Sequence, residues 1–178
     1  MRSQIKTDRL ELRFMESEDA LIVNRLSRHK DIYRNVGHLP PDIALSDTRD
    51  WIAGHAKGRD SKTDFVYAVA FMDEIIGCVG CHRRKIEDDF ALGYWLSPRH
   101  WGEGFMIEAT KAVLIELDKC FGPHSIKAGY FFDNPASGRI LQKLGFSKAG
   151  ESMEHCLGRG EKVNHINMLR KLQTELAP

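Results

Sequence analysis

The 178-residue sequence lacks any long hydrophobic run. Its longest apolar stretch, residues 65–72, is far shorter than the roughly 18 residues that a membrane-spanning helix needs. The first thirty residues carry charges throughout, which excludes a signal-peptide core. A charge excess is lacking too, because 26 Lys and Arg against 25 Asp and Glu leave a net charge of +1. We therefore expect a cytoplasmic protein with no membrane partner and no nucleic-acid partner, since general nucleic-acid binders carry a basic excess.

Cysteine is scarce, with only Cys78, Cys81, Cys120 and Cys156. In a reducing cytosol four free thiols are expected. Cys78 and Cys81 form a C-x-x-C, but they fall inside an apolar run typical of a strand, whereas a redox motif belongs at a strand-to-helix junction. A zinc site would need two more ligands at matching spacing. We predict buried thiols on opposite faces of a strand, and no metal.

No repeat and no Pro-, Gly- or Ser-rich linker divides the chain, so we expect one domain over residues 1–178. Apolar periodicity predicts its elements. Strands are expected at residues 10–14, 65–71, 75–81, 89–96, 125–132, 146–149 and 165–172, and helices at 17–28 (capped by Ser17), from Asp47 onward, at 104–121 and at 134–144, with a loop over 29–45. This order predicts an α/β or α+β sandwich, with helices packed against a mixed sheet.

The helix over 104–121 has an apolar stripe and a recognisable end. Gly122 and Pro123 stop it in the usual way. The stripe consists of Met106, Ala109, Val113, Leu117 and Cys120.

A glycine-bearing turn joins the strand that ends at Leu96 to this long helix. Gly102 and Gly104 leave backbone N–H groups without a neighbouring Cβ, at a helix N-terminus whose dipole favours anions. Arg99 can add a charge-assisted contact. The turn therefore suits a phosphate or diphosphate, although two glycines also suit a plain tight turn. The third glycine of a dinucleotide fingerprint and the Gly-Lys-Ser/Thr of a P-loop are both absent.

A second motif surrounds the helix over 134–144. Asn134 is a good N-cap, Pro135 suits the first helical position, and Gly145 ends the helix. Taken alone, this pattern is explained by capping.

Together the two segments resemble the GNAT superfamily of N-acetyltransferases. The shared motifs are R-x-x-G-x-G from Arg99, N-x-x-S from Asn134, and Leu144-Gly145-Phe146. The segments Thr7–Arg13 (TDRLELR) and Gly93–Leu96 (GYWL) resemble the Rim-type ribosomal-protein N-terminal acetyltransferases. The resemblance covers about residues 5–171. It implies a single GNAT-like domain, with a mixed, mostly antiparallel central sheet flanked by helices and a splayed pair of parallel strands that binds the cofactor.

The resemblance also implies acetyl-CoA as co-substrate and a primary amine as acceptor, attacking directly in a ternary complex. The amine would be a protein N-terminus or a small molecule, and a homodimer is compatible with the family. Asn134 would hold the pantetheine and Ser137 would assist the leaving thiolate. The other implied cofactor contacts are Trp95, Leu96, Arg99, His100, Trp101, Gly102, Glu103, Gly104 and Phe105.

The base that deprotonates the amine is not settled by the motifs. An alkyl ammonium must lose a proton before attack, whereas water can serve for an α-amine. Ala91 stands where relatives often carry Glu. Glu154, near a late catalytic Glu of the Rim-type enzymes, is our candidate, and His155 and His165 are alternatives. Two other functions stay open: a non-catalytic acyl-CoA-binding or sensing module, and a nucleotide-binding enzyme of another class.

Overall fold

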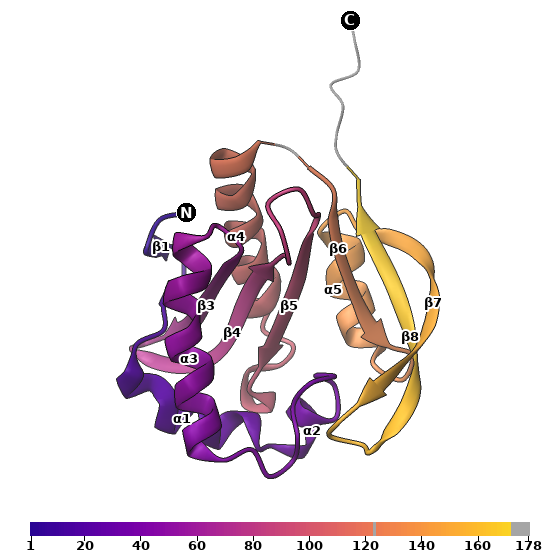
Figure 1. Ribbon diagram of the computed structural model, residues 1–178, viewed down its shortest axis with the longest axis horizontal. Coiled ribbons are helices and arrows are strands. Elements are labelled where there is room, and N and C mark those ends of the chain that lie inside the picture. Colours follow the sequence, from indigo (N-terminus) through magenta and orange to yellow (C-terminus); the bar gives the residue numbers. More distant parts are fainter. Residues whose placement is uncertain (123, 172–178) are drawn as a thin grey trace, which may run out of the picture.

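The computed structural model describes residues 1–122 and 124–171. A single eight-stranded sheet runs through this part of the chain in the order β1-β2-β3-β4-β5-β6-β8-β7 (Figure 1). The strands are Gln4–Lys6 (β1), Glu11–Phe14 (β2), Asp64–Phe71 (β3), Glu74–His82 (β4), Phe90–Leu96 (β5), Ile126–Phe131 (β6), Ser147–Cys156 (β7) and Glu161–Arg170 (β8). Neighbouring strands are antiparallel except β5 and β6, which are parallel. The predicted mixed, mostly antiparallel sheet is confirmed.

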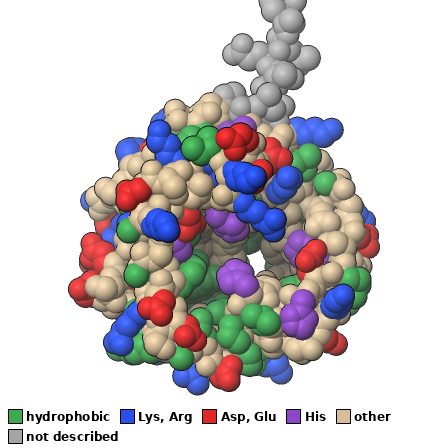
Figure 2. Space-filling model, in the orientation of Figure 1, with side chains coloured by type: hydrophobic (Ala, Val, Ile, Leu, Met, Phe, Trp, Pro, Cys, Tyr) green, Lys and Arg blue, Asp and Glu red, His purple; other side chains and the backbone are tan. Residues whose placement is uncertain are grey.

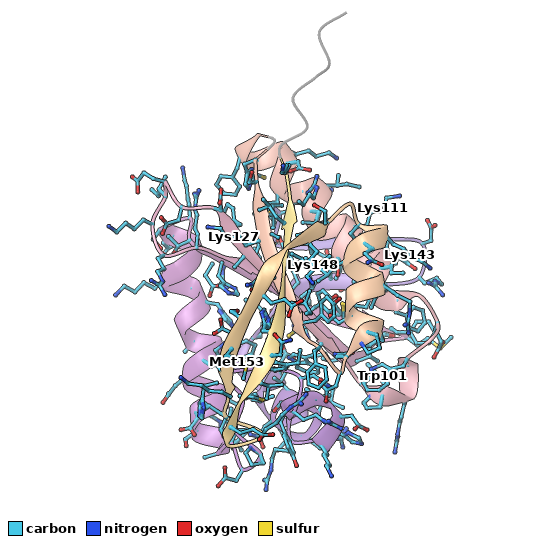
Figure 3. All side chains as sticks on the ribbon, turned by 90° about the vertical axis from the view of Figure 1, so that its right-hand side faces the viewer. Trp101, Lys111, Lys127, Lys143, Lys148 and Met153 are labelled. Atoms are coloured by element: carbon cyan, nitrogen blue, oxygen red, sulfur yellow. The ribbon has the colours of Figure 1, made fainter. Side chains whose placement is uncertain are left out.

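Helices cover both faces of the sheet. They are Ala20–Ser27 (α1), Lys30–Tyr33 (α2), Leu45–Asp60 (α3), Phe105–Phe121 (α4) and Pro135–Lys143 (α5), with short 3₁₀ turns at Ser17–Asp19 and Pro98–His100. α1 and α3 pack on β3 and β4 from one side, while α4 and α5 pack on the central strands from the other. Figure 3, turned by 90°, shows α3 and α5 on opposite sides of the sheet.

The parallel pair β5–β6 is the feature that positions the site. Only Phe90 with Ile126 and Ala91 with Lys127 are paired. β5 continues for five residues after Ala91, and along them it pairs with β4 but not with β6. The two strands therefore start as neighbours and then diverge, as the predicted splayed pair requires.

The apolar stripe of α4 forms much of the main core. Met106, Ala109, Val113 and Leu117 are all buried, as predicted. Cys120 is exposed, so its place in the stripe was wrong. Phe121 takes that place, because its ring packs 5.5 Å from Phe65 and 5.4 Å from Phe90 between ring centroids.

The cysteine prediction is confirmed for the C-x-x-C. All four cysteines are free, and Cys78 and Cys81 are buried. They belong to different core clusters, Cys81 on the α4 side of the sheet and Cys78 on the α1–α3 side. Burial raises the pKa of both thiols, that of Cys81 to about 12. Neither is a reactive thiolate near neutral pH.

Several element boundaries differ from the prediction. Ser17 begins a 3₁₀ turn rather than capping a helix, and Asp19 accepts the Glu16 N–H at 2.8 Å. The third helix begins at Leu45, two residues before Asp47. α2 lies inside the expected loop, and β1 was not expected. β7 and β8 are ten residues each, far longer than predicted for β7, because ladder pairing rather than apolar alternation defines them. Pro123 and the strand end at 172 lie outside the described residues.

Candidate active site

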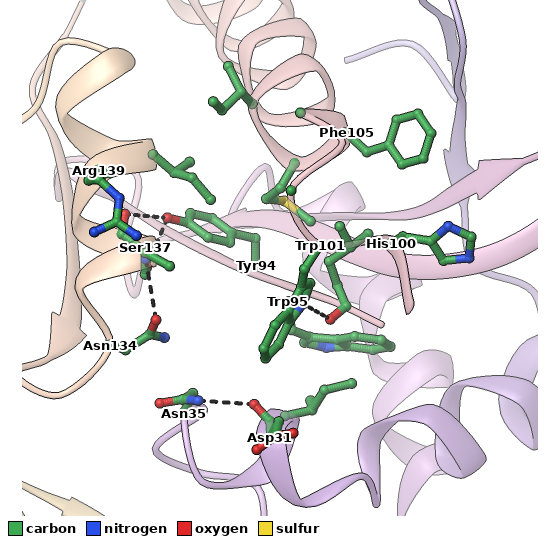
Figure 4. Close-up of a pocket in the computed structure, with 18 of the residues that line it drawn as sticks. Asp31, Asn35, Tyr94, Trp95, His100, Trp101, Phe105, Asn134, Ser137 and Arg139 are labelled. Carbon is green, nitrogen blue, oxygen red and sulfur yellow. Dashed lines mark hydrogen bonds between the residues drawn. The ribbon is translucent and has the colours of Figure 1, made fainter. Parts of the chain in front are cut away.

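A cleft of about 380 Å³ opens where β5 diverges from β6. One wall is the end of β5 with the turn that leads into α4. One face of α5, from Ala136 to Lys143, forms the opposite wall together with Asn134, and the α2 region closes one end (Figure 4). The cleft therefore joins the two segments that the sequence singled out.

The glycine turn at the mouth of the cleft has the backbone geometry of an anion site. Gly102 has φ of +84° and Gly104 has φ of +81°, in the left-handed region that favours glycine. Gly104 is the N-cap of α4. Within the described residues, no acceptor bonds the N–H groups of Gly102, Glu103 or Gly104, and Phe105 begins the helix, where N–H groups have no intrahelical partner. Four donors are thus free beside the positive end of the helix dipole.

This turn is fixed from outside by the N-terminal segment. The Arg9 guanidinium donates to the Glu103 carbonyl at 2.9 Å and to Glu108 Oε2 at 2.7 Å, and it lies 4.4 Å from the Phe105 ring centroid. The Arg9 N–H and the Thr7 hydroxyl donate to Glu108 Oε1, at 2.9 and 2.6 Å. Partial burial raises the pKa of Glu108, but the hydrogen bonds from Thr7 and Arg9 outweigh it and leave the pKa lowered. Glu108 is therefore an ionised anchor for the turn.

The free edge of β5 offers backbone groups to a ligand. The Ser97 N–H bonds to the Ile76 carbonyl of β4 at 2.7 Å. Because the groups of successive residues point to alternate sides of a strand, those of Leu96 and Tyr94 point away from β4, toward the gap. The Leu96 carbonyl accepts the indole N–H of Trp101 at 2.8 Å. The Leu96 N–H and both groups of Tyr94 remain for a ligand.

Two hydroxyl groups meet across the cleft. The Tyr94 and Ser137 hydroxyl oxygens are 2.9 Å apart, and the Tyr94 hydroxyl also lies 3.2 Å from the Ser137 carbonyl (Figure 4). Asn134 caps α5 by accepting the Ser137 N–H at 3.3 Å. Burial raises the pKa of Tyr94 to about 12, although the hydrogen bond with Ser137 lowers it somewhat. Tyr94 is therefore a neutral phenol that can donate.

Most predicted cofactor residues line this cleft. Ser137 and eight of the ten do so: Trp95, Leu96, His100, Trp101, Gly102, Gly104, Phe105 and Asn134. Arg99 instead lines a separate hollow beside α1. Glu103 is not among the residues that line the cleft, and its carboxylate lies 3.5 Å from His100 Nδ1. Glu154 is exposed on β7 and does not line the cleft.

Sequence reasoning missed three groups of cleft residues. Tyr94 could have been found by following the alternation of its strand, because Leu92, Tyr94 and Leu96 share one face. Arg139 and Lys143 supply cations from α5, one helical turn apart. Asp31 and Asn35 come from the α2 region, which carried no signal.

The described residues contain no group of three or more His, Cys, Asp or Glu that could hold a metal ion. None of the helices described is long and apolar enough to cross a membrane.

Comparison with known proteins agrees with this geometry. The family profile of the acetyltransferase (GNAT) domain matches residues 9–147. The chain belongs to the GNAT acetyltransferase family. It is 29% identical over 163 residues to the uncharacterized N-acetyltransferase YoaA of Bacillus subtilis, covering 88% of this chain and 89% of that protein. It is 33% identical over 75 residues to the [ribosomal protein uS5]-alanine N-acetyltransferase of Escherichia coli, covering 42% and 39% of the two chains.

Solved GNAT structures share the fold. RimL, a ribosomal L7/L12 alpha-N-protein acetyltransferase in complex with coenzyme A, superposes with a TM-score of 0.82 at 18% identity, over 97% of this chain and 99% of that one. The microcin C7 self-immunity acetyltransferase MccE, in complex with acetyl-CoA and AMP, gives 0.80 at 17% identity over 97% and 98%. As a GNAT acetyltransferase, this protein is an acetyl-CoA-dependent N-acetyltransferase.

The Arg9 contacts predict how this GNAT protein loses cofactor affinity. Replacing Arg9 by Ala frees the Glu103 carbonyl. If the turn holds acetyl-CoA, as the sequence motif predicts, the ligand must then itself order the turn, at about 1–2 kcal/mol per residue fixed. We expect the Kd for acetyl-CoA, measured by calorimetry, to rise roughly tenfold. The matched control is Lys6→Ala, because the Lys6–Glu11 pair is exposed and 3.9 Å long. An unchanged Kd in Arg9→Ala would refute the anchoring role.

Proposed function

We propose that the diphosphate of acetyl-CoA binds the free N–H groups of residues 102–105. The single observation that carries this placement is four unbonded donors at a helix N-terminus, open to a cleft. Both glycines leave the approach clear of a Cβ: no atom lies within 4 Å of the position at Gly102, and only Arg9 does at Gly104. Arg139 and Lys143 add positive charge on the facing wall. Arg99, which the sequence motif placed beside the diphosphate, is left out of the proposed site because it lines the other hollow.

From this anchor the pantetheine arm runs along the free edge of β5, as an added strand. The Leu96 N–H and the Tyr94 backbone groups are the partners for its amides. Asn134 and Trp95 line the same path. This course carries the thioester to the Tyr94–Ser137 pair, at the point where β5 and β6 separate.

The reaction is attack of a neutral primary amine on the thioester carbonyl, helped chiefly by holding both reactants together. Backbone N–H groups of β5 are the candidate donors to the oxyanion. Ser137, held by Tyr94 and Asn134, donates a hydrogen bond to the departing thiolate sulfur. Glu154 contributes on the amine side, where its carboxylate accepts a hydrogen bond from Ser152 at 2.8 Å.

For the acceptor we propose a primary amine, with a protein N-terminus as the leading class. Support comes from the uS5-alanine N-acetyltransferase among the relatives. Because MccE was solved with AMP as well as acetyl-CoA, small-molecule amines are also tested as acceptors. We also propose that residues 1–178 form one domain, supported by the single sheet. A cytoplasmic location is supported by four cysteines that are all free thiols.

The decisive experiment combines binding with turnover. Acetyl-CoA should raise the melting temperature, because a ligand that binds only the folded state stabilises it. Thiol release should then appear with at least one member of a panel of alanine- and serine-initiated peptides and small primary amines. Stabilisation without thiol release from any amine would favour a sensing module instead. Stabilisation by NAD or ATP but not by acetyl-CoA would favour another class of nucleotide-binding enzyme.

Substituting Gly104 tests the anion site directly. In Gly104→Val a side chain is forced into the left-handed region and its Cβ lies 3.5 Å from Arg9 Nη2, so the free N–H groups lose their arrangement. We expect the thermal shift with acetyl-CoA to disappear. Gly122→Val is the matched control, since Gly122 ends the same helix with φ of +75°, and it should keep the shift. Retained affinity in a folded Gly104→Val would place the diphosphate elsewhere.

The role of Ser137 is tested by removing its hydroxyl. Ser137→Ala should lower kcat by about 10²-fold, the usual contribution of a positioned proton donor, with the KM for acetyl-CoA unchanged. Tyr94→Phe distinguishes the contributions of the two hydroxyl groups. We expect a smaller loss of kcat in this variant, because Ser137 still faces the sulfur. A full kcat in Ser137→Ala, or a larger loss in Tyr94→Phe, would transfer the role to the phenol.

A further inference from the structure

A chain of hydrogen bonds crosses the face of the β7–β8 ladder that is turned away from α5. The Ser152 hydroxyl donates to Glu154 Oε1 at 2.8 Å. The Asn167 amide N–H donates to Ser152 Oγ at 3.2 Å. Asn167 Oδ1 lies 3.0 Å from Nδ1 of His165. Four side chains from two strands are thus connected in one line.

The direction of this chain is set by Glu154. An ionised carboxylate only accepts, so the single Ser152 proton goes to it rather than to Asn167 Oδ1, which is 3.5 Å away. Ser152 Oγ then accepts from the Asn167 amide, which leaves Asn167 Oδ1 as an acceptor. In the neutral form of His165 the proton is therefore placed on Nδ1, which donates to Asn167 Oδ1, and the lone pair is placed on Nε2. Hydrogen bonds aligned in this way polarise one another.

The imidazole of His165 is seated on a glycine of β6. A Cβ at Gly129 would lie 2.1 Å from His165 Cε1 and 2.7 Å from Nε2, so no other residue permits this position of the ring. Phe131 packs against the ring edge at 5.6 Å between centroids. Among the described residues none is hydrogen-bonded to Nε2, and Nε2 is not one of the enclosed unpaired atoms. Nε2 is therefore an oriented nitrogen that is not fully enclosed, on a half-buried ring that lies outside the residues lining the cleft.

Gly129 lies at the point where the sheet opens. Counted two residues beyond the last pair, Ala91 with Lys127, Gly93 and Gly129 occupy equivalent positions on the diverging strands. Tyr94, which contacts Ser137 on the α5 side, follows Gly93 directly. His165 and Ser137 thus lie on opposite faces of the sheet at the same opening. Figure 2 shows histidine side chains around a hollow in the middle of the molecule.

Other titratable groups on this face are less suited to accept a proton. His82 lies 3.8 Å from where a Cβ at Gly93 would be, but within the described residues no hydrogen bond holds its ring. Burial lowers the pKa of His38, in the loop after α2, and the nearby His82 lowers it further. His55 is 3% exposed and bound to Asp64 at 2.6 Å, so an outside amine cannot reach it. His155 adjoins Glu154 on the strand and therefore points to the opposite face.

We propose that Nε2 of His165 accepts the proton of the acceptor ammonium, and that Glu154 acts through Ser152 and Asn167 as a positioning residue. This inference rests on the proposed function. The ammonium gives one proton to Nε2, which later releases it to water. The amine nitrogen then forms the C–N bond, the C–S bond breaks, and the second nitrogen proton goes to the thiolate. The products are the amide, the CoA thiol and one proton.

The first test needs no acceptor and reads the histidine itself. Imidazole ¹⁵N shifts of the full-length protein distinguish the two neutral tautomers. We expect the Nδ1–H form of His165 in the wild type and its loss in Asn167→Ala. His155→Gln should leave the His165 signal unchanged. An Nε2–H form in the wild type would overturn the proposal.

The second test is kinetic and uses the alanine-initiated peptide with thiol release as readout. His165→Gln should lower kcat/KM by roughly 10²-fold, with acetyl-CoA affinity and melting temperature close to wild type. Asn167→Asp should shift the acidic limb of the pH profile to higher pH, because a carboxylate there favours the protonated imidazole. A merely structural role would not move that limb. His155→Gln should retain wild-type kinetics.

Glu154→Gln separates a positioning residue from a direct base. The amide still accepts from Ser152, so we expect a loss below about tenfold. A loss in Glu154→Gln that exceeds the loss in His165→Gln would make Glu154 the base and overturn the proposal. Failure of the proposed function is recognised separately, as absence of thiol release by the wild type. In that case the ¹⁵N measurement alone still shows which ring nitrogen of His165 carries the proton.

Discussion

The divergence of β5 from β6 is the constraint on which the site depends. A parallel pair that stayed in register would satisfy its backbone groups internally and leave no place for a ligand between the strands. Here the pairing ends at Ala91 and Lys127, and on one face α4 packs against β5 while α5 packs against β6. The unpaired edge of β5 is therefore a strand edge inside the protein, protected from other chains but open to a narrow ligand. A molecule with spaced amides is what such an edge can pair with.

The glycine turn shows why the proposed diphosphate site needs residues far from it in sequence. A turn with two left-handed glycines has many alternative conformations in isolation, because glycine is permissive. Arg9 restricts this freedom because its guanidinium donates hydrogen bonds to both the Glu103 carbonyl and the Glu108 carboxylate. Thr7 reinforces Glu108 from the same segment. The segment Thr7–Leu10, which resembles the Rim-type enzymes, and the glycine motif are thus linked physically, because Thr7 and Arg9 fix the conformation of the glycine turn.

The sequence predicted the parts of the protein whose signals are local. The strands around the C-x-x-C, helix α4 and the Asn134 cap all follow from apolar runs, glycines and capping residues. α2 could not be predicted, because a helix of four residues is too short to show a helical repeat of apolar residues. β7 and β8 carry mixed polar residues, and only their pairing with each other and with β6 makes them strands. The contact between Arg9 and Glu103, and the seat of His165 on Gly129, join residues that no spacing rule relates.

The sequence named Glu154, His155 and His165 as separate candidates for one task, and the ladder separates their roles. Alternation along β7 puts Glu154 and His155 on opposite faces, while register puts Ser152 opposite His165. Glu154 reaches the imidazole only through two neutral side chains, which transmit orientation but keep the negative charge at a distance. That arrangement suits a base which must release its proton after each turnover, since a carboxylate in direct contact would hold the imidazolium more tightly. The same opening of the sheet then keeps this base and the hydroxyl of Ser137 on opposite faces, so the incoming amine and the departing thiol approach and leave without crossing.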